Sequence, residues 1–329
     1  MGRTILVTGA GGFIGSAVTR RLIRWAEAGA VLWDGERVET VCALLRPGSS
    51  TERLEDTLQS PLLAVEQADI THIGALQDVM GRHSPKAVLH LAFDPSGFEP
   101  QTEEEWRARH FAPVETMFEA LSRIDGGRFV HTSSAWVLAP GEGLAENARI
   151  APSLDYAKAK AKLDHALEPL QRTYGVPFVN LRLFNVFGRY EDIHRLLPHL
   201  VDQWRSGRPA RLTHGEQVRD FNDVDDIAEA FRLALLCPPS ACGAVYHIGS
   251  GRGTSVREFA AMVRAAMDVP GEIEFDTART RDQHVPSLVS SPALAVRALG
   301  WRPADDLESR IRAAVDWWLA RPQSEGTSA

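Results

Sequence analysis

Three groups of residues in this chain have the chemical types and the order that hydride and proton transfer at an alcohol or a ketone require. The glycine-rich stretch Gly9–Gly15 comes first, Ser134 follows, and Tyr156 and Lys160 come next, four residues apart. A glycine loop can hold a dinucleotide, and Ser, Tyr and Lys side chains can orient and protonate a substrate oxygen. A Tyr-x-x-x-Lys spacing alone is common, whereas these three groups in this order are not.

Ser134, Tyr156 and Lys160 are the predicted catalytic residues. Tyr156 and Lys160 lie on one face of a predicted helix. There the Lys160 ammonium would lower the pKa of the tyrosine and hold the nicotinamide ribose. Tyr156 would pass a proton to or from the substrate oxygen, and Ser134, at the end of a strand, would orient that oxygen. A solvent-exposed Tyr and Lys without a role is the alternative that the spacing alone leaves open.

The glycine stretch is predicted to bind the cofactor, because it follows a strand and opens a helix. Gly9 permits the tight turn, Gly12 lets the backbone approach the pyrophosphate, and Gly15 lets the helix pack closely on the strand. The amino end of the helix then faces the phosphates with unpaired N–H groups. Phe13 and Ile14, which lie within the glycine stretch, are predicted to contact the cofactor as well.

The ends of the second and third predicted strands should contact the adenosine of the cofactor. Arg46 stands where an acid would bond the ribose 2′-hydroxyl, and an arginine can pair with a 2′-phosphate. This favours NADP over NAD, although a solvated loop arginine is the alternative. Asp69 and Ile70 could reach the adenine amino group; a loop-capping aspartate is the alternative.

The elements that must position these residues alternate along the first half of the chain. Short apolar runs alternate with helical patterns such as Ser16–Trp25 and Glu103–Arg123, which indicates a parallel, doubly wound sheet with helices on both faces. The sequence therefore predicts an α/β fold of the Rossmann type, with a smaller C-terminal lobe that binds substrate. The predicted strands are Thr4–Val7, Thr40–Leu45, Leu62–Val65, Ala87–Ala92, Arg128–Thr132 and Phe178–Leu183.

The expected domain division follows from a change of pattern after Leu183, where prolines punctuate shorter elements. Residues 1–183 form the dinucleotide-binding domain, and 220–250 return to it through Val245–Ile248. Residues 184–219 and 251–321 form the substrate lobe, and 322–329 are a frayed tail. The long link 26–39 reads as an extended helix plus a hairpin.

Composition excludes several classes of function. The net charge of the 329 residues is -7 without a basic stretch, so we expect no nucleic-acid partner. No apolar run could span a membrane and no signal peptide is recognised, so we expect a cytoplasmic protein. Cys42, Cys237 and Cys242 make no disulfide framework, and the last two are interpreted as unconnected thiols. The eleven histidines show no ligand spacing, so no metal is expected.

Taken together, the motifs resemble the extended short-chain dehydrogenase/reductase family, in its branch of sugar-nucleotide epimerases, dehydratases and reductases. The resemblance covers nearly the whole chain. It rests on Val7-Thr8-Gly9, Val88–Ala92, Thr132–Ser134, Tyr156–Lys160, Arg182–Gly188, Arg219–Asp226, Ile248–Gly251 and Leu299–Pro303.

The resemblance implies roles for further residues. Leu91 and Ala92 would contact the cofactor, and Trp136 would line the sugar pocket together with the stretch after Ala92. Asn185, Arg219 and Arg281 match positions that contact the diphosphate of the substrate, which suits the fork of an arginine side chain. From the residues alone, Arg219 could equally form an ion pair with the neighbouring aspartate.

Departures from the family pattern bear on the reaction. No Asp or Glu follows Ser134, which argues against a dehydratase, and His110 replaces a usual asparagine. We therefore expect a 4-keto sugar reductase or a 4-epimerase acting on a nucleoside-diphosphate sugar. The alternatives are an NADPH-dependent ketone reductase of a non-sugar metabolite and a catalytically silent cofactor-binding sensor or scaffold. Apolar residues in Glu103–Arg123 and Asp155–Arg172 favour a homodimer through a four-helix interface.

Overall fold

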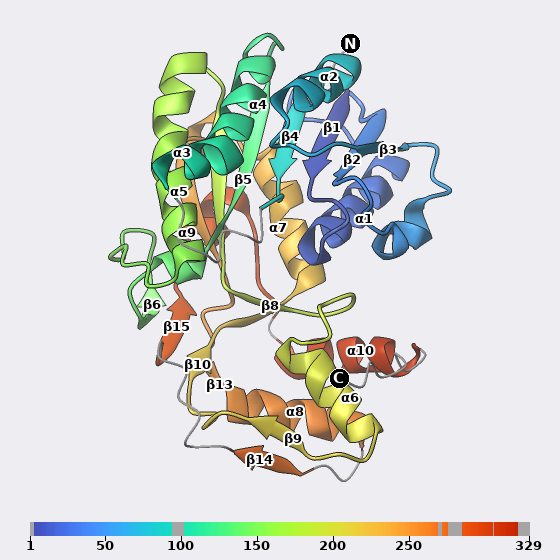
Figure 1. The fold of residues 1–329 in the computed structure, drawn as a ribbon, viewed down its shortest axis with the longest axis vertical. Helices are drawn as coiled ribbons and strands as arrows, with labels where there is room; N and C mark the ends of the chain where they lie inside the picture. The colour runs from blue at the N-terminus through green and yellow to red at the C-terminus, as the bar shows by residue number, and fades with distance from the viewer. Residues whose placement is uncertain (1–2, 94–101, 269–271, 276–284, 305, 322–329) are drawn as a thin grey trace.

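A computed structural model describes residues 3–93, 102–268, 272–275, 285–304 and 306–321. A single parallel sheet of seven strands occupies the upper part of the molecule in Figure 1, in the order β12-β7-β5-β4-β1-β2-β3. This is the doubly wound sheet that the sequence predicts. Its strands are β1 (Thr4–Thr8), β2 (Thr40–Leu45), β3 (Leu63–Gln67), β4 (Ala87–His90), β5 (Arg128–Ser134), β7 (Phe178–Leu183) and β12 (Ala244–Ile248).

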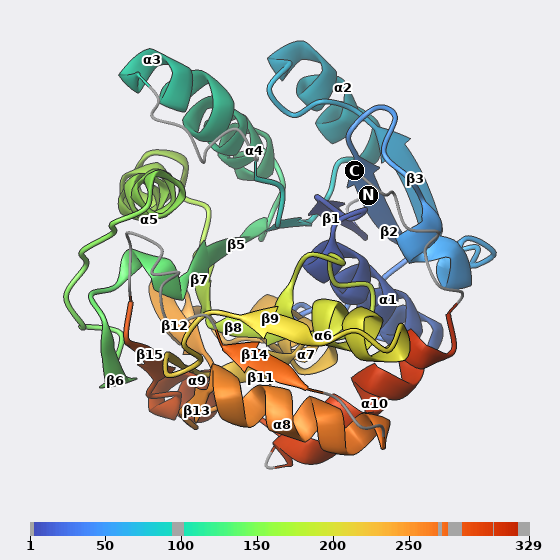
Figure 2. The same cartoon turned by 60° about the horizontal axis from the view of Figure 1, so that its bottom comes forward.

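Helices cover both faces of this sheet (Figure 2). The residues of α1 (Phe13–Glu27), α7 (Val224–Leu236) and α9 (Ala293–Leu299) share one apolar core with one face of the strands. The residues of α2 (Ile73–His83), α4 (Ala112–Ser122) and α5 (Asp155–Tyr174) share a second core with the other face. Apart from the edge strand β3, the strands are almost wholly buried, as expected for a parallel sheet that lies between two helical layers.

The predicted helix over Glu103–Arg123 contains an irregular turn. Helix α3 (Glu103–Trp106) begins with a capping box between Thr102 and Glu105, and α4 follows after a π-helical turn at Arg107–Phe111. Single π turns in helices are frequent at functional sites. The turn contains His110, whose side chain is buried.

A second group of elements packs around its own apolar core in the lower part of Figure 1. Its helices are α6 (Leu196–Arg205), α8 (Val256–Met267) and α10 (Leu307–Leu319). Short strands complete it: β6 (Gly141–Leu144), β8 (Asn185–Phe187), β9 (Ala210–Leu212), β10 (Val218–Arg219), β11 (Phe221–Asp223), β13 (Thr254–Ser255), β14 (Ile273–Phe275) and β15 (Ser287–Ser290). The residues of α9 were expected in the substrate lobe. Helix α9 instead packs on strand β12 of the large sheet and on helix α7.

The link over residues 26–39 continues α1 to Glu27 and then forms a hairpin, closed by an antiparallel bridge between Val31 and Arg37. Trp33 in this hairpin lies 4.2 Å from the Arg128 guanidinium. The predicted helix plus hairpin is therefore confirmed.

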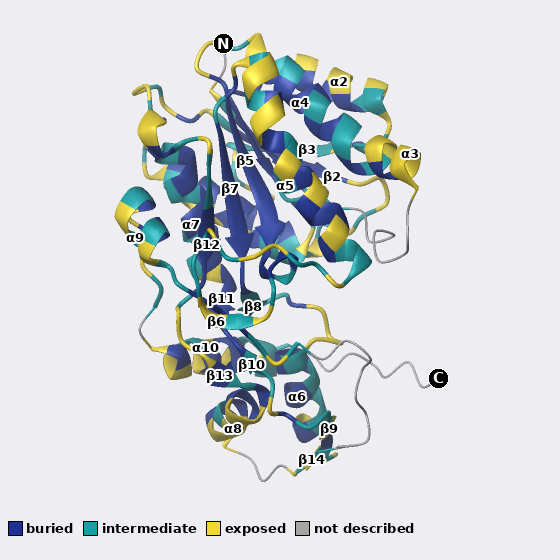
Figure 3. Ribbon diagram, turned by 90° about the vertical axis from the view of Figure 1, so that its left-hand side faces the viewer, coloured by how far each residue is buried: buried dark blue, intermediate teal, exposed yellow. Residues whose placement is uncertain are grey.

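The homodimer was expected because the helices over 103–123 and 155–172 carry more apolar residues than one sheet face needs. In the structure, most of these residues are buried within the chain. Val114, Phe118 and Leu167 are each 0% exposed, because they pack into the core of this chain. The exposed residues on the outer face of α5 (Figure 3) include Lys162 and Arg172, which pair with carboxylates of the same chain.

Candidate active site

The glycine loop has a conformation that only glycine adopts readily. Gly9 has a φ of 70°, and a Cβ on it would lie 2.7 Å from the backbone nitrogen of Ala92. A Cβ on Gly15 would lie 2.0 Å from the carbonyl oxygen of Gly9. The loop, the start of α1 and the segment after β4 are thus packed backbone against backbone.

The amino end of α1 has the features of an anion site. Gly12 is its N-cap residue, and no side chain caps this end of the helix. The first N–H groups, at Phe13, Ile14 and Gly15, therefore suit a pyrophosphate. Of the predicted loop residues, Gly9 and Gly12 line the adjoining cleft. Phe13, Ile14 and Gly15 would contact the cofactor through their backbone N–H groups.

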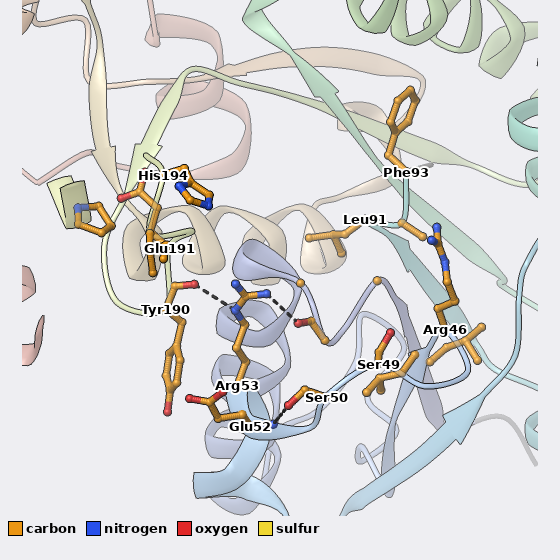
Figure 4. Close-up of a pocket in the computed structure, with 18 of the residues that line it drawn as sticks. Arg46, Ser49, Ser50, Glu52, Arg53, Leu91, Phe93, Tyr190, Glu191 and His194 are labelled. Carbon is orange, nitrogen blue, oxygen red and sulfur yellow. Dashed lines mark hydrogen bonds between the residues drawn. The ribbon is translucent and has the colours of Figure 1, made fainter. Parts of the chain in front are cut away.

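The glycine loop opens into a cleft of about 1400 Å³ between the large sheet and the second group of elements. This exceeds the roughly 300–1,000 Å³ of a typical single-ligand pocket. Figure 4 shows Arg46, Leu91 and Phe93 at one side and Tyr190, Glu191 and His194 at the other. Of the predicted cofactor residues, Gly9, Gly12, Arg46, Asp69, Ile70, Leu91 and Ala92 line this cleft.

At the adenosine end of the cleft, Arg46 is exposed directly after β2, and Ser49 and Ser50 line the cleft beside it. Asp69 accepts hydrogen bonds from the Thr71 nitrogen at 2.9 Å and the Thr71 hydroxyl at 2.8 Å. The backbone bond from Thr71 lowers the pKa of Asp69, and the charge of Arg46 adds to the effect. Asp69 therefore caps its loop, while it still faces the cleft.

The sequence analysis missed Arg53, which joins the two walls of the cleft. Its Nε donates to the Tyr190 carbonyl at 3.1 Å, and its Nη1 donates to the Gly11 carbonyl at 3.4 Å (Figure 4). Arg53 lies in the 3-10 turn Glu52–Thr57, seven residues after Arg46, and no local motif marks it.

Ser134, Tyr156 and Lys160 converge at the carboxyl end of β5. Ser134 is the last residue of β5, and a side-chain hydrogen bond joins it to Tyr156, the second residue of α5. Lys160, one helical turn further along α5, is 3% exposed and its Nζ donates to the Thr132 carbonyl at 2.8 Å. The three predicted catalytic residues thus lie together.

The electrostatics of the pair differ from the prediction. Burial raises the pKa of Tyr156, and the hydrogen bond to Ser134 and the charge of Arg195 oppose this rise only in part. Burial therefore outweighs the lowering of the Tyr156 pKa that was predicted from the Lys160 charge, and the net direction is a rise. Burial also lowers the pKa of Lys160 to about 8, and Asp164 acts against that decrease.

Two aromatic side chains lie over the Tyr156 and Lys160 pair. The Phe93 ring stacks on the His110 ring with centroids 4.5 Å apart and meets the Tyr156 ring edge-on at 5.1 Å. The Lys160 ammonium lies 4.3 Å from the Phe93 ring centroid. The π turn between α3 and α4 therefore places His110 next to the catalytic pair.

Asp164 is a buried carboxylate behind the catalytic pair that the sequence analysis did not identify. Its Oδ2 accepts from the Ser133 hydroxyl at 2.7 Å and from Arg182 Nη2 at 3.2 Å. Asp164 follows Lys160 by four residues, so the acid at helical spacing was a signal available in the sequence.

Two buried histidines, His90 and His131, lie near the same group. Burial lowers the pKa of His90 to about 3 and also lowers the pKa of His131, so both rings are neutral at physiological pH.

Arg219 lies in the second group of elements, in β10. Its guanidinium donates to the Val218 carbonyl at 2.7 Å and the Val285 carbonyl at 2.9 Å, and it lies 5.5 Å from the Trp136 ring centroid. The structure brings Arg219 and Trp136 together.

The alternative ion pair of Arg219 with Asp220 is not observed among the described residues. The Asp220 carboxylate instead accepts from Ser250, Gly251 and Ser290, which ties β10 to β15. Arg281 lies outside the described residues.

Near the start of α6 lie residues that no motif in the sequence marks. Asn185, a predicted substrate residue, begins β8, and Arg195 is the N-cap residue of α6. Neither of them lines the cleft, whereas Tyr190, Glu191 and His194 do. Arg195 Nε lies 3.8 Å from Glu191 Oε1. Burial raises the pKa of Glu191 to about 8, so this acid is largely protonated at neutral pH.

Within the described ranges, no group of three or more His, Cys, Asp or Glu side chains has the arrangement of a metal site. A search of the same ranges found no helix long and apolar enough to cross a membrane.

Comparisons with known proteins agree with this geometry. The model of the NAD dependent epimerase/dehydratase family matches residues 5–249. The chain is 29% identical to dTDP-glucose 4,6-dehydratase of Neisseria meningitidis, over 96% of this chain and 93% of that protein. It is also 29% identical to dTDP-glucose 4,6-dehydratase 1 of Escherichia coli K12, over 96% and 92%.

Solved structures have the same fold. UDP-glucose 4-epimerase from Thermotoga maritima, solved with UDP-glucose, superposes with a TM-score of 0.81 at 24% identity over 96% of this chain and 98% of that one. A dTDP-glucose 4,6-dehydratase from Bacillus anthracis in complex with NAD superposes with a TM-score of 0.81 at 20% identity, over 96% of each chain.

Proposed function

This chain belongs to the NAD dependent epimerase/dehydratase family, and from that premise we propose that it transfers hydride at a carbon of a nucleoside-diphosphate sugar. The observation that carries the proposal is the convergence of Ser134, Tyr156 and Lys160. Tyr156 and Lys160 contact the Phe93 ring, which lines the glycine-loop cleft. A nicotinamide cofactor in this cleft would accept or supply the hydride. The sugar oxygen would lie against Tyr156.

Ser134, Tyr156 and Lys160 have different roles in the proposed reaction. Ser134, already hydrogen-bonded to the Tyr156 phenol, orients the substrate oxygen. Tyr156 keeps its proton at neutral pH because burial raises its pKa, so it is ready to donate to a ketone and accepts the proton in the reverse direction. Lys160, held by the Thr132 carbonyl, holds the nicotinamide ribose and supplies positive charge beside the developing phenolate.

NADP is the proposed cofactor, with NAD as the alternative. Arg46, Ser49 and Ser50 line the adenosine end of the cleft and offer a cation and two hydroxyls to a 2′-phosphate. Several related structures were solved in complex with NAD. The preference for NADP in this chain therefore depends on the Arg46 side chain.

Residues at the start of α6 and in the second group of elements support a substrate with a diphosphate. Arg195 and the amino end of α6 offer a charged fork and backbone N–H groups to phosphate oxygens. Asn185, Arg219 and Arg281 are proposed to complete the clamp, and Trp136 beside Arg219 to line the sugar pocket. The relatives act on, or were solved with, dTDP- and UDP-linked sugars, which supports the class of substrate.

Within this class we favour a 4-keto sugar reductase or a 4-epimerase over a dehydratase. The turn that follows Ser134 consists of Ala135, Trp136 and Val137, without a carboxylate to remove and return a proton during loss of water. If Arg46 selects NADP, a single hydride delivery to a 4-keto sugar is favoured over an epimerisation that recycles the cofactor in place.

The first experiment is to denature the purified protein and to identify the released nucleotide by mass and amount. Little bound nucleotide, with NADPH binding tighter than NADH, supports the reductase. Near-stoichiometric NAD supports the epimerase and refutes the role of Arg46. The protein is then incubated with a panel of nucleoside-diphosphate sugars and 4-keto sugars, with products separated by chromatography. Turnover of an uncharged ketone but of no diphosphate sugar would refute the proposed substrate class.

A Tyr156→Phe variant tests catalysis itself. Loss of the phenol should reduce turnover by about 10²–10⁴-fold and leave cofactor binding intact. Unchanged function in this variant would indicate a cofactor-binding sensor or scaffold instead of an enzyme.

Three further expectations are kept as proposals. They are a dinucleotide-binding domain of residues 1–183 to which residues 220–250 return, a cytoplasmic location, and a homodimer. A dimer through α4 and α5 would have to pair charged faces, since their apolar residues are buried in this chain. Light scattering at micromolar concentration measures its mass.

A further inference from the structure

Two of the three cysteines lie in contact at the turn between α7 and β12. The Cys237 and Cys242 sulfurs are 3.7 Å apart. The sequence analysis interpreted them as unconnected thiols, and the structure corrects this interpretation. A disulfide requires about 2.0 Å, so the two side chains must rotate towards each other before the sulfurs reach bonding distance.

The turn is built to hold the two sulfurs in place. Pro238 and Pro239 restrict the backbone between them, and the Cys242 nitrogen donates to the Pro239 carbonyl at 3.1 Å. Arg128 Nη1 donates to the Cys237 carbonyl at 2.8 Å. Little conformational freedom therefore has to be lost when the sulfurs join.

The two thiols differ in accessibility and in acidity. Cys237 is 3% exposed, whereas Cys242 is partly exposed. The hydrogen bond with Cys237 lowers the pKa of Cys242, and the Arg128 charge adds to this effect. The pKa of Cys237 is raised, first by the same hydrogen bond and then by burial. Cys242 is thus the accessible nucleophile and Cys237 the buried resolving thiol.

We propose that Cys237 and Cys242 are a redox modification site, which a hydroperoxide converts to a reversible disulfide that links the end of α7 to the start of β12. The site is remote in sequence and in fold from Ser134, Tyr156 and Lys160. It lies before the amino end of β12, whereas Ser134 ends β5 at its carboxyl end and the other two lie in α5. The proposal is independent of the proposed enzymatic reaction.

The chemistry balances without a further reactant. The Cys242 thiolate attacks one peroxide oxygen, the O–O bond breaks, hydroxide leaves, and Cys242 becomes a sulfenic acid. The Cys237 sulfur then attacks the Cys242 sulfur, the S–O bond breaks, and the departing oxygen leaves as water with the Cys237 proton. Two thiols have lost two electrons and two protons, and one hydrogen peroxide has become two waters.

Cys42 provides an internal control. It is 0% exposed in β2, and burial raises its pKa to about 12, so it should not react. The chain has three cysteines. After treatment of the reduced full-length protein with equimolar hydrogen peroxide, thiol titration in denaturant should therefore find one thiol. Intact mass should fall by two hydrogens, and dithiothreitol should reverse both changes.

Three variants separate the proposal from general oxidation. Cys42→Ser should still lose two hydrogens. Cys237→Ser should gain one oxygen at Cys242, which dimedone traps, without a cross-link. Cys242→Ser should react slowly or not at all. The native protein is also expected to melt a few degrees higher when oxidised, because the disulfide restrains the unfolded chain.

Several outcomes would overturn the proposal. Three titratable thiols after peroxide treatment show that the contact is unreactive. A disulfide that includes Cys42, a cross-link between two chains, or addition of oxygen to the wild-type Cys242 without loss of Cys237 would each show that the turn does not pair these sulfurs.

Discussion

Replacement of Asp164 by asparagine should move the titration of Lys160 to lower pH. Burial already lowers the pKa of Lys160 to about 8, and the Asp164 carboxylate acts in the opposite direction. Residues four apart on one helix face lie about 6 Å apart. With an effective dielectric constant of about 20, a carboxylate at this distance stabilises the ammonium by about 2.8 kcal/mol, or about two pH units.

The chain makes a direct measurement possible, because it contains only four lysines: Lys86, Lys158, Lys160 and Lys162. Carbon-13 labelling of lysine gives four side-chain signals by NMR, and a Lys160→Arg variant assigns the buried one. The expected midpoint is near pH 8 in the wild type and about two units lower in Asp164→Asn. Because the ammonium is the form lost as pH rises, the variant should keep a charged Lys160 only in more acidic solution.

Control variants distinguish the loss of the Asp164 charge from a change in the surrounding structure. Ser133→Ala removes the 2.7 Å hydrogen bond to Asp164 but keeps the carboxylate, so the Lys160 midpoint should stay within about half a pH unit. Asp164→Asn leaves the Arg182 guanidinium buried without its ion-pair partner, at a cost of about 3–5 kcal/mol. If that variant does not fold, Asp164→Asn combined with Arg182→Met removes both charges and should give a smaller displacement. A folded Asp164→Asn protein with the wild-type midpoint would refute this electrostatic reasoning.

Three other perturbations have defined outcomes. Gly9→Ala should abolish cofactor binding and destabilise the fold by on the order of 2 kcal/mol, since its φ is positive and the Cβ would meet the Ala92 backbone; unchanged NADPH affinity by calorimetry would contradict this. Arg46→Glu should reverse the preference for NADPH over NADH by about tenfold or more in paired titrations, because a carboxylate repels a 2′-phosphate and bonds a 2′-hydroxyl. Glu191→Gln should remove a pH dependence of stability. The raised pKa of Glu191 means that its contribution is complete below pH 4.5 and is lost as pH rises towards about 8. Melting temperatures of the wild type should therefore fall relative to the variant across that window, and parallel curves would exclude the effect.

The sequence predicted the positions of the candidate site residues because each position depends only on neighbouring residues in the chain. Gly9 and Gly15 stand where a strand meets a helix, and Tyr156 and Lys160 have the spacing of one helix face. Parallel strands bring their carboxyl ends to one edge, so Ser134 at the end of β5 had to lie near the glycine loop.

The sequence alone determined the family and the doubly wound sheet and predicted the catalytic set, since these depend on periodicity and on spacing within single elements. Only the tertiary structure decided what surrounds them. Arg53 joins the two walls of the cleft, Phe93 and His110 stack over the catalytic pair, and Cys237 and Cys242 come into contact. Such contacts depend on where separate elements pack and which side chains burial removes from water. Burial also reversed the expected acidity of Tyr156, because the cost of removing a phenolate from water exceeds the stabilisation by nearby groups.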